Sequence, residues 1–161
     1  MEKVLYVIAH NIRSAHNVGA ILRTSDGAGV KKVYLTGYSP IPYDSKRDAY
    51  PAHAHNMIAK TALGAENFVS WEKHDDLWKL IEEMKSSGIR MFALEKNSDS
   101  LDFREANYSF PCALILGEEI DGVSAEILNK CDKVISIPMK GKKESLNVSV
   151  AAGIAIYEIL K

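Results

Sequence analysis

The C-terminal stretch from Val134 to Lys161 places the strongest constraint on the fold. It begins as an apolar, strand-like run, breaks at Pro138, crosses a basic loop that contains Gly141, and enters a long apolar helix. The junction carries small polar residues that could cap the helix and point hydrogen-bonding groups at a ligand: Ser145, Asn147 and Ser149. The helix then presents a broad apolar face of Val148, Ala151, Ala152, Ile154, Ala155 and Ile159. A buried core helix would explain the alanines equally well, but it explains less well why SLNVS directly follows this loop.

The N-terminal half of the chain alternates strand and helix patterns. Apolar runs predict strands at Val4–Ala9, Lys32–Thr36 and Asn67–Ser70, and helical spacing predicts helices at Ala15–Gly29 and His53–Leu63. The loop from Gly37 to Ala52 is longer than a simple connection requires. Its tyrosines alternate with Lys46 and Arg47, which suits stacking on exposed RNA bases or packing against a partner subunit.

The second half continues the same alternation. A helix is predicted at Asp75–Ser86, with Leu77, Trp78, Leu80, Ile81 and Met84 inside, and a strand at Ile89–Leu94. The polar segment Lys96–Ser109 is either a second functional loop or a short excursion at the sheet edge. Strand Cys112–Leu116 then runs into the turn Gly117–Ser124, and helix Ala125–Lys130 follows. This order predicts an α/β fold with a mostly parallel sheet, helices on both faces, and a ligand site at the carboxyl ends of the strands.

The length of 161 residues fits a single domain, residues 1–161, because the chain has no internal repeat or linker. Cys112 and Cys131 have no CxxC spacing, and each is expected to be a buried thiol in a reduced, cytoplasmic protein. The apolar run at the N-terminus is too short for a signal peptide, and no window is long enough to span a membrane.

A formal net charge of −1 argues against a protein that holds nucleic acid by bulk charge. Two local basic clusters remain, Lys140 with Lys142 and Lys143, and Lys46 with Arg47, and a solvated loop would explain either one. His53 and His55 stand two residues apart, which is the wrong spacing for two ligands on one helix face. No metal site is therefore expected.

The common nucleotide-binding motifs are missing. Neither GxGxxG nor GxxxxGK[ST] occurs, and no acidic residue ends the second strand to hold a ribose. These absences disfavour a dehydrogenase and a Rossmann-type methyltransferase.

Three blocks of the sequence form a specific combination: Asn17–Val30, Leu114–Ser124 and Ile135–Glu158. The first contains Asn17 followed by Arg23, the second contains Glu119 within GxExxG, and the third contains SLNVS. Together they resemble the SpoU (TrmH) family of knotted methyltransferases. The blocks and the strand before them cover close to half of the chain.

This resemblance implies a deep trefoil knot in the C-terminal third and a homodimer with sites near the interface. It also implies S-adenosylmethionine as methyl donor and a ribose 2'-hydroxyl of tRNA or rRNA as acceptor, without a metal. Since no separate RNA-binding domain is expected in the chain, the catalytic domain itself would recognise RNA. The cofactor-binding residues that the resemblance implies are Leu116, Gly117, Glu118, Gly122, Ile137, Met139 and Leu146.

The resemblance further implies five catalytic residues: Arg23, Asn17, Ser145, Asn147 and Glu119. Arg23 would bind phosphate and activate the hydroxyl, although an arginine stays protonated and is a poor general base. Asn17, Ser145 and Asn147 would orient the ribose and the arginine. Glu119 would fix its own loop or the arginine of the partner subunit.

Two other functions compete with an RNA methyltransferase. A noncatalytic RNA-binding module with the same fold would need a basic patch but not the whole constellation of five residues. An unrelated α/β enzyme acting on a small nucleotide would be expected to carry one of the missing motifs. The choice between tRNA and rRNA stays open.

Overall fold

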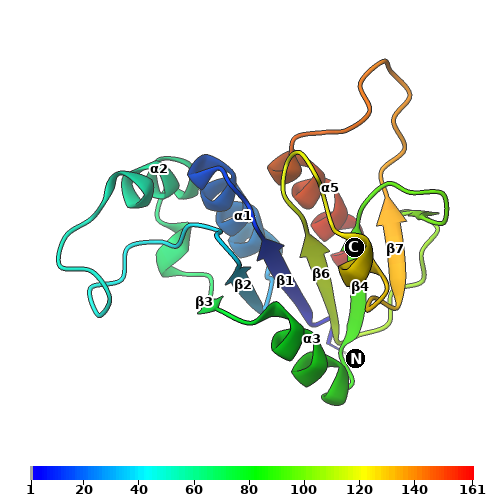
Figure 1. Cartoon of the computed structure of the whole chain (residues 1–161), viewed down its shortest axis with the longest axis horizontal. Coiled ribbons are helices and arrows are strands. Elements are labelled where there is room, and N and C mark those ends of the chain that lie inside the picture. Colours follow the sequence, from blue (N-terminus) through cyan, green and yellow to red (C-terminus); the bar gives the residue numbers. More distant parts are fainter. Residues whose placement is uncertain (1) are drawn as a thin grey trace.

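The computed structural model describes residues 2–161, and its centre is a seven-stranded sheet in the order β3-β2-β1-β6-β4-β7-β5 (Figure 1). Every pairing between neighbouring strands is parallel. The strands are β1 Leu5–His10, β2 Lys32–Thr36, β3 Trp71–His74, β4 Arg90–Leu94, β5 Leu101–Asp102, β6 Cys112–Leu116 and β7 Lys133–Ser136. The predicted α/β fold with a parallel sheet is confirmed.

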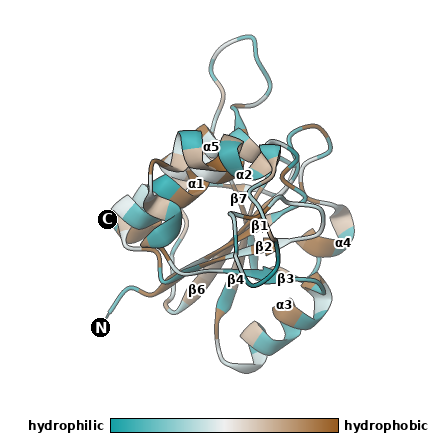
Figure 2. Cartoon of the chain, turned by 90° about the vertical axis from the view of Figure 1, so that its left-hand side faces the viewer, coloured by the Kyte–Doolittle hydropathy of each residue, from teal (hydrophilic) through white to brown (hydrophobic). Residues whose placement is uncertain are grey.

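Helices cover both faces of this sheet. They are α1 Ala15–Ala28, α2 His53–Ala62, α3 Leu77–Ser86, α4 Ala125–Leu128 and α5 Val148–Leu160, with a short 3-10 helix, η1, at Ala65–Asn67. Figure 2 shows α1, α2 and α5 on one side of the strands and α3 and α4 on the other. The buried apolar residues accordingly form two clusters, one under each helical layer.

The central strands explain why the sequence contains such continuous apolar runs. Successive side chains of a strand point to opposite faces, so Leu114 joins the cluster under α1 while Ile115 joins the cluster under α3. All five residues of β6 are buried. A strand that is covered on both faces needs apolar residues at every position, and each fully buried leucine or isoleucine contributes roughly 1.5–3 kcal/mol.

Two local predictions are wrong. The strand expected at Asn67–Ser70 begins only at Trp71, because the amides of Phe68 and Val69 donate to the carbonyl of Ala65 and close a turn after η1. Trp78 was expected inside, but its side chain is 42% exposed. Leu77, Leu80, Ile81 and Met84 already fill the buried face of α3, and Trp78 lies beside that face.

The polar segment Lys96–Ser109 contributes β5, a two-residue edge strand that pairs with β7. This supports an excursion at the sheet edge. Between residues 2 and 161, none of the helices has both the length and the apolar character needed to cross a bilayer.

Candidate active site

A cavity of about 190 Å³ lies where the chain leaves β4, β6 and β7 at their carboxyl ends. The turn after β6 forms one wall, and the loop between β7 and α5 forms the opposite wall. All seven residues predicted to bind the cofactor line this cavity: Leu116, Gly117, Glu118, Gly122, Ile137, Met139 and Leu146. Two of the five predicted catalytic residues, Glu119 and Ser145, line it as well.

Two glycines allow the turn after β6 to fold back on itself. A Cβ on Gly117 would lie 2.3 Å from the carbonyl carbon of Gly122, so only glycine fits there. Gly122 has a positive φ of 66°, and a Cβ on it would lie 2.0 Å from Oε2 of Glu95. These glycines therefore shape the cavity wall through contacts within the protein.

Glu95 also lines the cavity, although no sequence motif indicates it. It follows β4, and its Oε2 accepts a hydrogen bond of 2.8 Å from the backbone N–H of Val123. Its carboxylate thereby ties the end of β4 to the turn after β6. A single glutamate at the end of a strand gives no sequence signal of this role.

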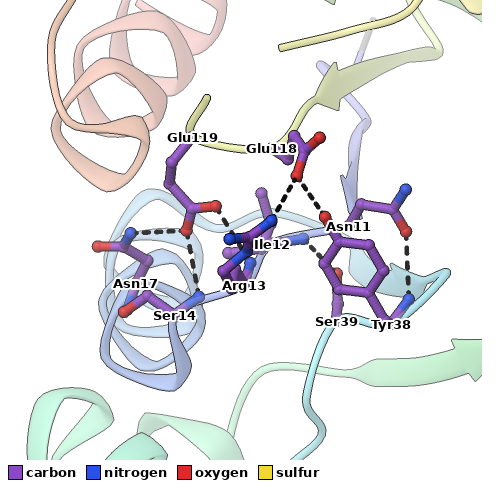
Figure 3. A network of polar contacts seen from close by, with 9 residues as sticks. All are labelled: Asn11, Ile12, Arg13, Ser14, Asn17, Tyr38, Ser39, Glu118 and Glu119. Atoms are coloured by element: carbon purple, nitrogen blue, oxygen red, sulfur yellow. Dashed lines mark hydrogen bonds and ion pairs between the residues drawn. The ribbon is translucent and has the colours of Figure 1, made fainter. Parts of the chain in front are cut away.

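Glu119 links the turn after β6 to the start of α1 (Figure 3). Its carboxylate accepts hydrogen bonds from the backbone N–H groups of Arg13 and Ser14, at 3.1 and 3.2 Å, and from Nδ2 of Asn17, at 3.0 Å. Burial alone would raise the pKa of Glu119, but these donors stabilise the carboxylate and the net effect is a lowered pKa. The position also suits a negative charge, because Ser14 caps the N-terminus of α1.

Asn147 extends this contact to the third sequence block. It is the N-cap of α5, and its Oδ1 accepts from the backbone N–H and the hydroxyl of Ser149, at 2.9 and 2.6 Å. Its Nδ2 donates to Oδ1 of Asn17 at 3.2 Å. A continuous chain of hydrogen bonds therefore runs from Asn147 through Asn17 to Glu119, with one member from each block. The predicted capping of this helix is confirmed for Asn147.

Glu118 forms a second contact on the other side of the same turn. The hydroxyl of Tyr38, at the start of the long loop after β2, donates to its Oε2, and a guanidinium nitrogen of Arg13 lies 3.6 Å from the same oxygen. The hydrogen bond from Tyr38 is the main reason that the pKa of Glu118 is lowered. The loop after β2 is thus connected directly to the cavity wall.

Arg23 lies away from these contacts. It is exposed on α1 and does not line the cavity. Six residues of α-helix correspond to about 9 Å of rise and about 240° of rotation, so Arg23 and Asn17 point to different sides of α1. Within residues 2–161, no group forms a hydrogen bond or ion pair with its guanidinium. The next residue, Thr24, faces Gly153 of α5, which places Arg23 beside the seam between the two helices.

No three His, Cys, Asp or Glu side chains of the described chain are grouped as a metal site would require. Fold and site together define an α/β protein with a ligand cavity at the carboxyl edge of a parallel sheet, joined by hydrogen bonds to the N-termini of two helices.

Comparison with known proteins agrees with this class. The model of the SpoU rRNA methylase family matches residues 4–157. The tRNA (guanosine(18)-2'-O)-methyltransferase of Aquifex aeolicus is 38% identical over 98% of this chain and 69% of its own length. The enzyme of the same name from Escherichia coli K12 is 31% identical over 96% of this chain and 62% of its own length. This chain belongs to the SpoU rRNA methylase family.

Solved structures show the same similarity. The TrmH/SpoU tRNA modifying enzyme of Aquifex aeolicus superimposes with a TM-score of 0.81 at 36% identity, over 99% of this chain and 75% of the other. An rRNA methyltransferase from Sinorhizobium meliloti with bound AdoMet gives a TM-score of 0.86 at 25% identity, over 99% of this chain and 56% of the other. The chain thus spans from about half to three quarters of the length of these relatives.

Proposed function

We propose that this chain transfers a methyl group from S-adenosylmethionine to a ribose 2'-hydroxyl of RNA. The observation that carries this proposal is the hydrogen-bond chain Asn147–Asn17–Glu119, which brings the three family blocks together beside the cavity. A noncatalytic RNA-binding module would have no need for this arrangement. The names of the family and of its similar members support the same activity.

The residues around the cavity fit S-adenosylmethionine. Apolar side chains of Leu116, Ile137 and Leu146 suit the faces of an adenine ring. The carboxylates of Glu95, Glu118 and Glu144 suit the positively charged sulfur and amine of the same molecule. The bound cofactor supplies an electrophilic methyl carbon attached to a positively charged sulfur. The remaining task of the protein is to place the acceptor hydroxyl in line with that carbon.

We assign the acceptor side to the five predicted catalytic residues. Asn17 and Asn147 hold each other, and Glu119 fixes Asn17, so their amides are oriented before RNA binds. Ser145 lines the cavity and offers its hydroxyl to the ribose. Arg23 binds the phosphate next to the target ribose with two parallel N–H groups. When the ribose oxygen accepts the methyl group, its proton passes to that phosphate or to water, and the cofactor is released as the neutral thioether S-adenosylhomocysteine. Alignment of this kind can supply roughly 7–11 kcal/mol.

We infer that the active form is a homodimer, in which Arg23 serves the cavity of the partner subunit. Three exposed apolar residues follow one another along one face of α5: Val150 at 51%, Ile154 at 39% and Tyr157 at 56%. This face adjoins the seam with α1, where Arg23 lies outside its own cavity. Pairing two copies of α5 would cover the apolar face and bring Arg23 toward the site of the second copy.

We further propose a single domain with a C-terminal trefoil knot and a cytoplasmic location. The knot is supported by the path of the chain, which leaves β7 beyond β4 and returns past the turn after β6 to pack α5 against α1 (Figure 1). One sheet with one apolar cluster on each face supports a single domain. Two free cysteines with no disulfide and an RNA substrate support the cytoplasm.

The substrate class is tRNA or rRNA, and the more similar relatives favour tRNA. The test is to map ribose methylation across cellular RNA with and without the gene. We expect one 2'-O-methylated nucleotide to disappear from tRNA and to return with the wild-type gene. Unchanged methylation of both tRNA and rRNA would contradict the proposed function.

A further inference from the structure

The two walls of the cavity are held in different ways. The turn after β6 is fixed by the hydrogen bonds of Glu95 and Glu119 and by a backbone hydrogen bond of 3.0 Å from Gly122 to Glu118. The opposite wall is formed by residues 137–146, which we call the β7–α5 loop. This loop contributes Ile137, Met139, Glu144, Ser145 and Leu146 to the cavity.

Within the described chain, no hydrogen bond or ion pair begins or ends on the β7–α5 loop. Before the loop, the last hydrogen bond runs from the amide of Phe103 to the carbonyl of Ser136. After the loop, the first hydrogen bonds are those of Asn147. Figures 1 and 2 both show this loop projecting away from the body of the molecule. One wall of the cavity is therefore formed by a segment that the protein itself anchors only at its two ends.

The same loop carries Lys140, Lys142 and Lys143, which are all exposed and form no ion pair with any residue between 2 and 161. Glu144 is the one acidic residue within it. Helix α3, which contains the acidic residue Glu82, lies on the side of the sheet opposite to α1, α2 and α5 (Figure 2). The chain as a whole has a net charge of −1, so these lysines form a local positive site directly beside the cavity.

We propose that Lys140, Lys142 and Lys143 bind backbone phosphates of the substrate RNA and thereby fix the second wall of the cofactor cavity. Lysine side chains that neutralise phosphates release counterions, which favours binding without sequence preference. Phosphates held by three lysines of one loop restrict that loop, and Ile137, Met139 and Leu146 are then held against the cofactor. RNA and cofactor consequently bind with positive coupling, and each increases the affinity of the other by the same factor.

This inference rests on the proposed function, since it requires an RNA substrate and a cofactor in the cavity. The test uses the full chain and S-adenosylhomocysteine, the cofactor without its methyl group, so that no reaction occurs during the titration. Its dissociation constant is measured by calorimetry with and without an unmodified tRNA transcript. RNA affinity is measured separately over a range of salt concentrations.

The test variant carries Lys140→Gln, Lys142→Gln and Lys143→Gln together. A matched control carries Lys31→Gln, Lys60→Gln and Lys79→Gln, which removes the same charge from exposed positions that do not line the cavity. In the wild type and the control we expect RNA to tighten cofactor binding about fivefold or more. In the test variant this tightening disappears. The salt dependence of RNA binding also weakens: each phosphate contact on a single strand contributes about 0.7 to the steepness of log affinity against log salt, so the loss of three contacts reduces that steepness by about 2.

The RNA-free affinity for S-adenosylhomocysteine should be the same in all three proteins. A test variant that retains the coupling and the salt slope of the control would overturn the proposal. Weaker cofactor binding by the test variant without RNA would also overturn it, because the lysines would then support the cavity directly. A wild-type protein that binds no tRNA or rRNA would instead refute the proposed function.

Discussion

Nδ2 of Asn147 donates a hydrogen bond of 3.2 Å to Oδ1 of Asn17, although the two residues are 130 positions apart. The contact joins the N-cap of α5 to the first turn of α1. Because Asn17 also donates to Glu119, the positions of three separate segments depend on one another. The candidate site is therefore assembled only when the C-terminal helix has packed against the N-terminal helix.

Replacing Glu119 with Gln should loosen this assembly, since the variant loses the negative charge that accepts from Arg13, Ser14 and Asn17. We expect the free energy of unfolding to fall by about 1 kcal/mol at neutral pH. The pKa of Glu119 is lower in the folded than in the unfolded chain. Its contribution to the free energy of unfolding is therefore fully present at a pH above the ordinary glutamate pKa, and it is lost as the pH falls through the folded-state pKa. Urea titrations of wild type and variant should therefore converge in acid. Glu82→Gln, on the exposed side of α3, is the control, and a pH-independent difference for Glu119→Gln would argue against the network.

Replacing Gly117 with Ala should abolish binding of S-adenosylmethionine. The new Cβ would lie 2.3 Å from the carbonyl group of Gly122, so the turn must move and the cavity wall with it. The matched control is Gly141→Ala, where no atom of residues 2–161 other than the glycine and its two chain neighbours lies within 4 Å of the new Cβ. Its cofactor affinity should stay as in the wild type. Calorimetry without added metal checks both variants. Normal binding by Gly117→Ala would exclude this cavity as the cofactor site.

A charge on the exposed face of α5 should separate the subunits. Ile154→Glu would place a carboxylate at the centre of the proposed interface, where burial of an unpaired charge is costly. Light scattering should report about twice the chain mass for the wild type and one chain mass for the variant, with loss of methyl transfer. Phe68→Glu changes a residue that is 79% exposed on a different surface and should stay dimeric. A wild-type monomer with full activity would refute the shared site.

Mixed dimers test whether Arg23 acts on the cavity of the partner subunit. Arg23→Ala leaves the cavity intact, and Gly117→Ala leaves the arginine intact, so each homodimer should be inactive. A heterodimer of the two variants contains one intact cavity that faces one intact Arg23. Unfolding and refolding an equal mixture should therefore restore a part of the methyl-transfer activity. If both groups must come from one chain, the mixture will stay inactive.

The sheet and the cavity wall could be predicted because their signals are local. Buried strands such as β6 are continuous apolar runs, and Gly117 and Gly122 mark a turn in which side chains do not fit. Local signals failed at Asn67–Ser70, where a strand was predicted. The apolar residues Phe68 and Val69 suit a strand, but they suit equally well the turn that follows η1, in which both are found. Trp78 shows a second limit, since large apolar residues also occur at the margin of a helix's buried face.

Contacts between distant segments could not be predicted from residue patterns. Glu95 accepts a hydrogen bond from the amide of Val123, and Tyr38 donates one to Glu118, which is 80 positions away. Neither Glu95 nor Tyr38 belongs to a recognisable motif. The resemblance to a family indicated Asn17, Glu119 and Asn147 together, but only their distances show that they form one chain of hydrogen bonds. The same geometry shows that Arg23 does not line the cavity of the chain to which it belongs.

The most direct test of the account is single-turnover methyl transfer from labelled S-adenosylmethionine to an unmodified tRNA transcript, with RNA and enzyme saturating. Nucleoside mass spectrometry then identifies the position of the methyl group. We predict a 2'-O-methylated ribose with the wild type. The rate should collapse with both Arg23→Ala and Arg23→Lys, because lysine keeps the charge but lacks the planar guanidinium of arginine. Both variants should keep the cofactor affinity of the wild type. Near-wild-type rates in both variants would remove Arg23 from the catalytic residues. No methylated ribose from the wild type, with tRNA or with rRNA, would contradict the account as a whole.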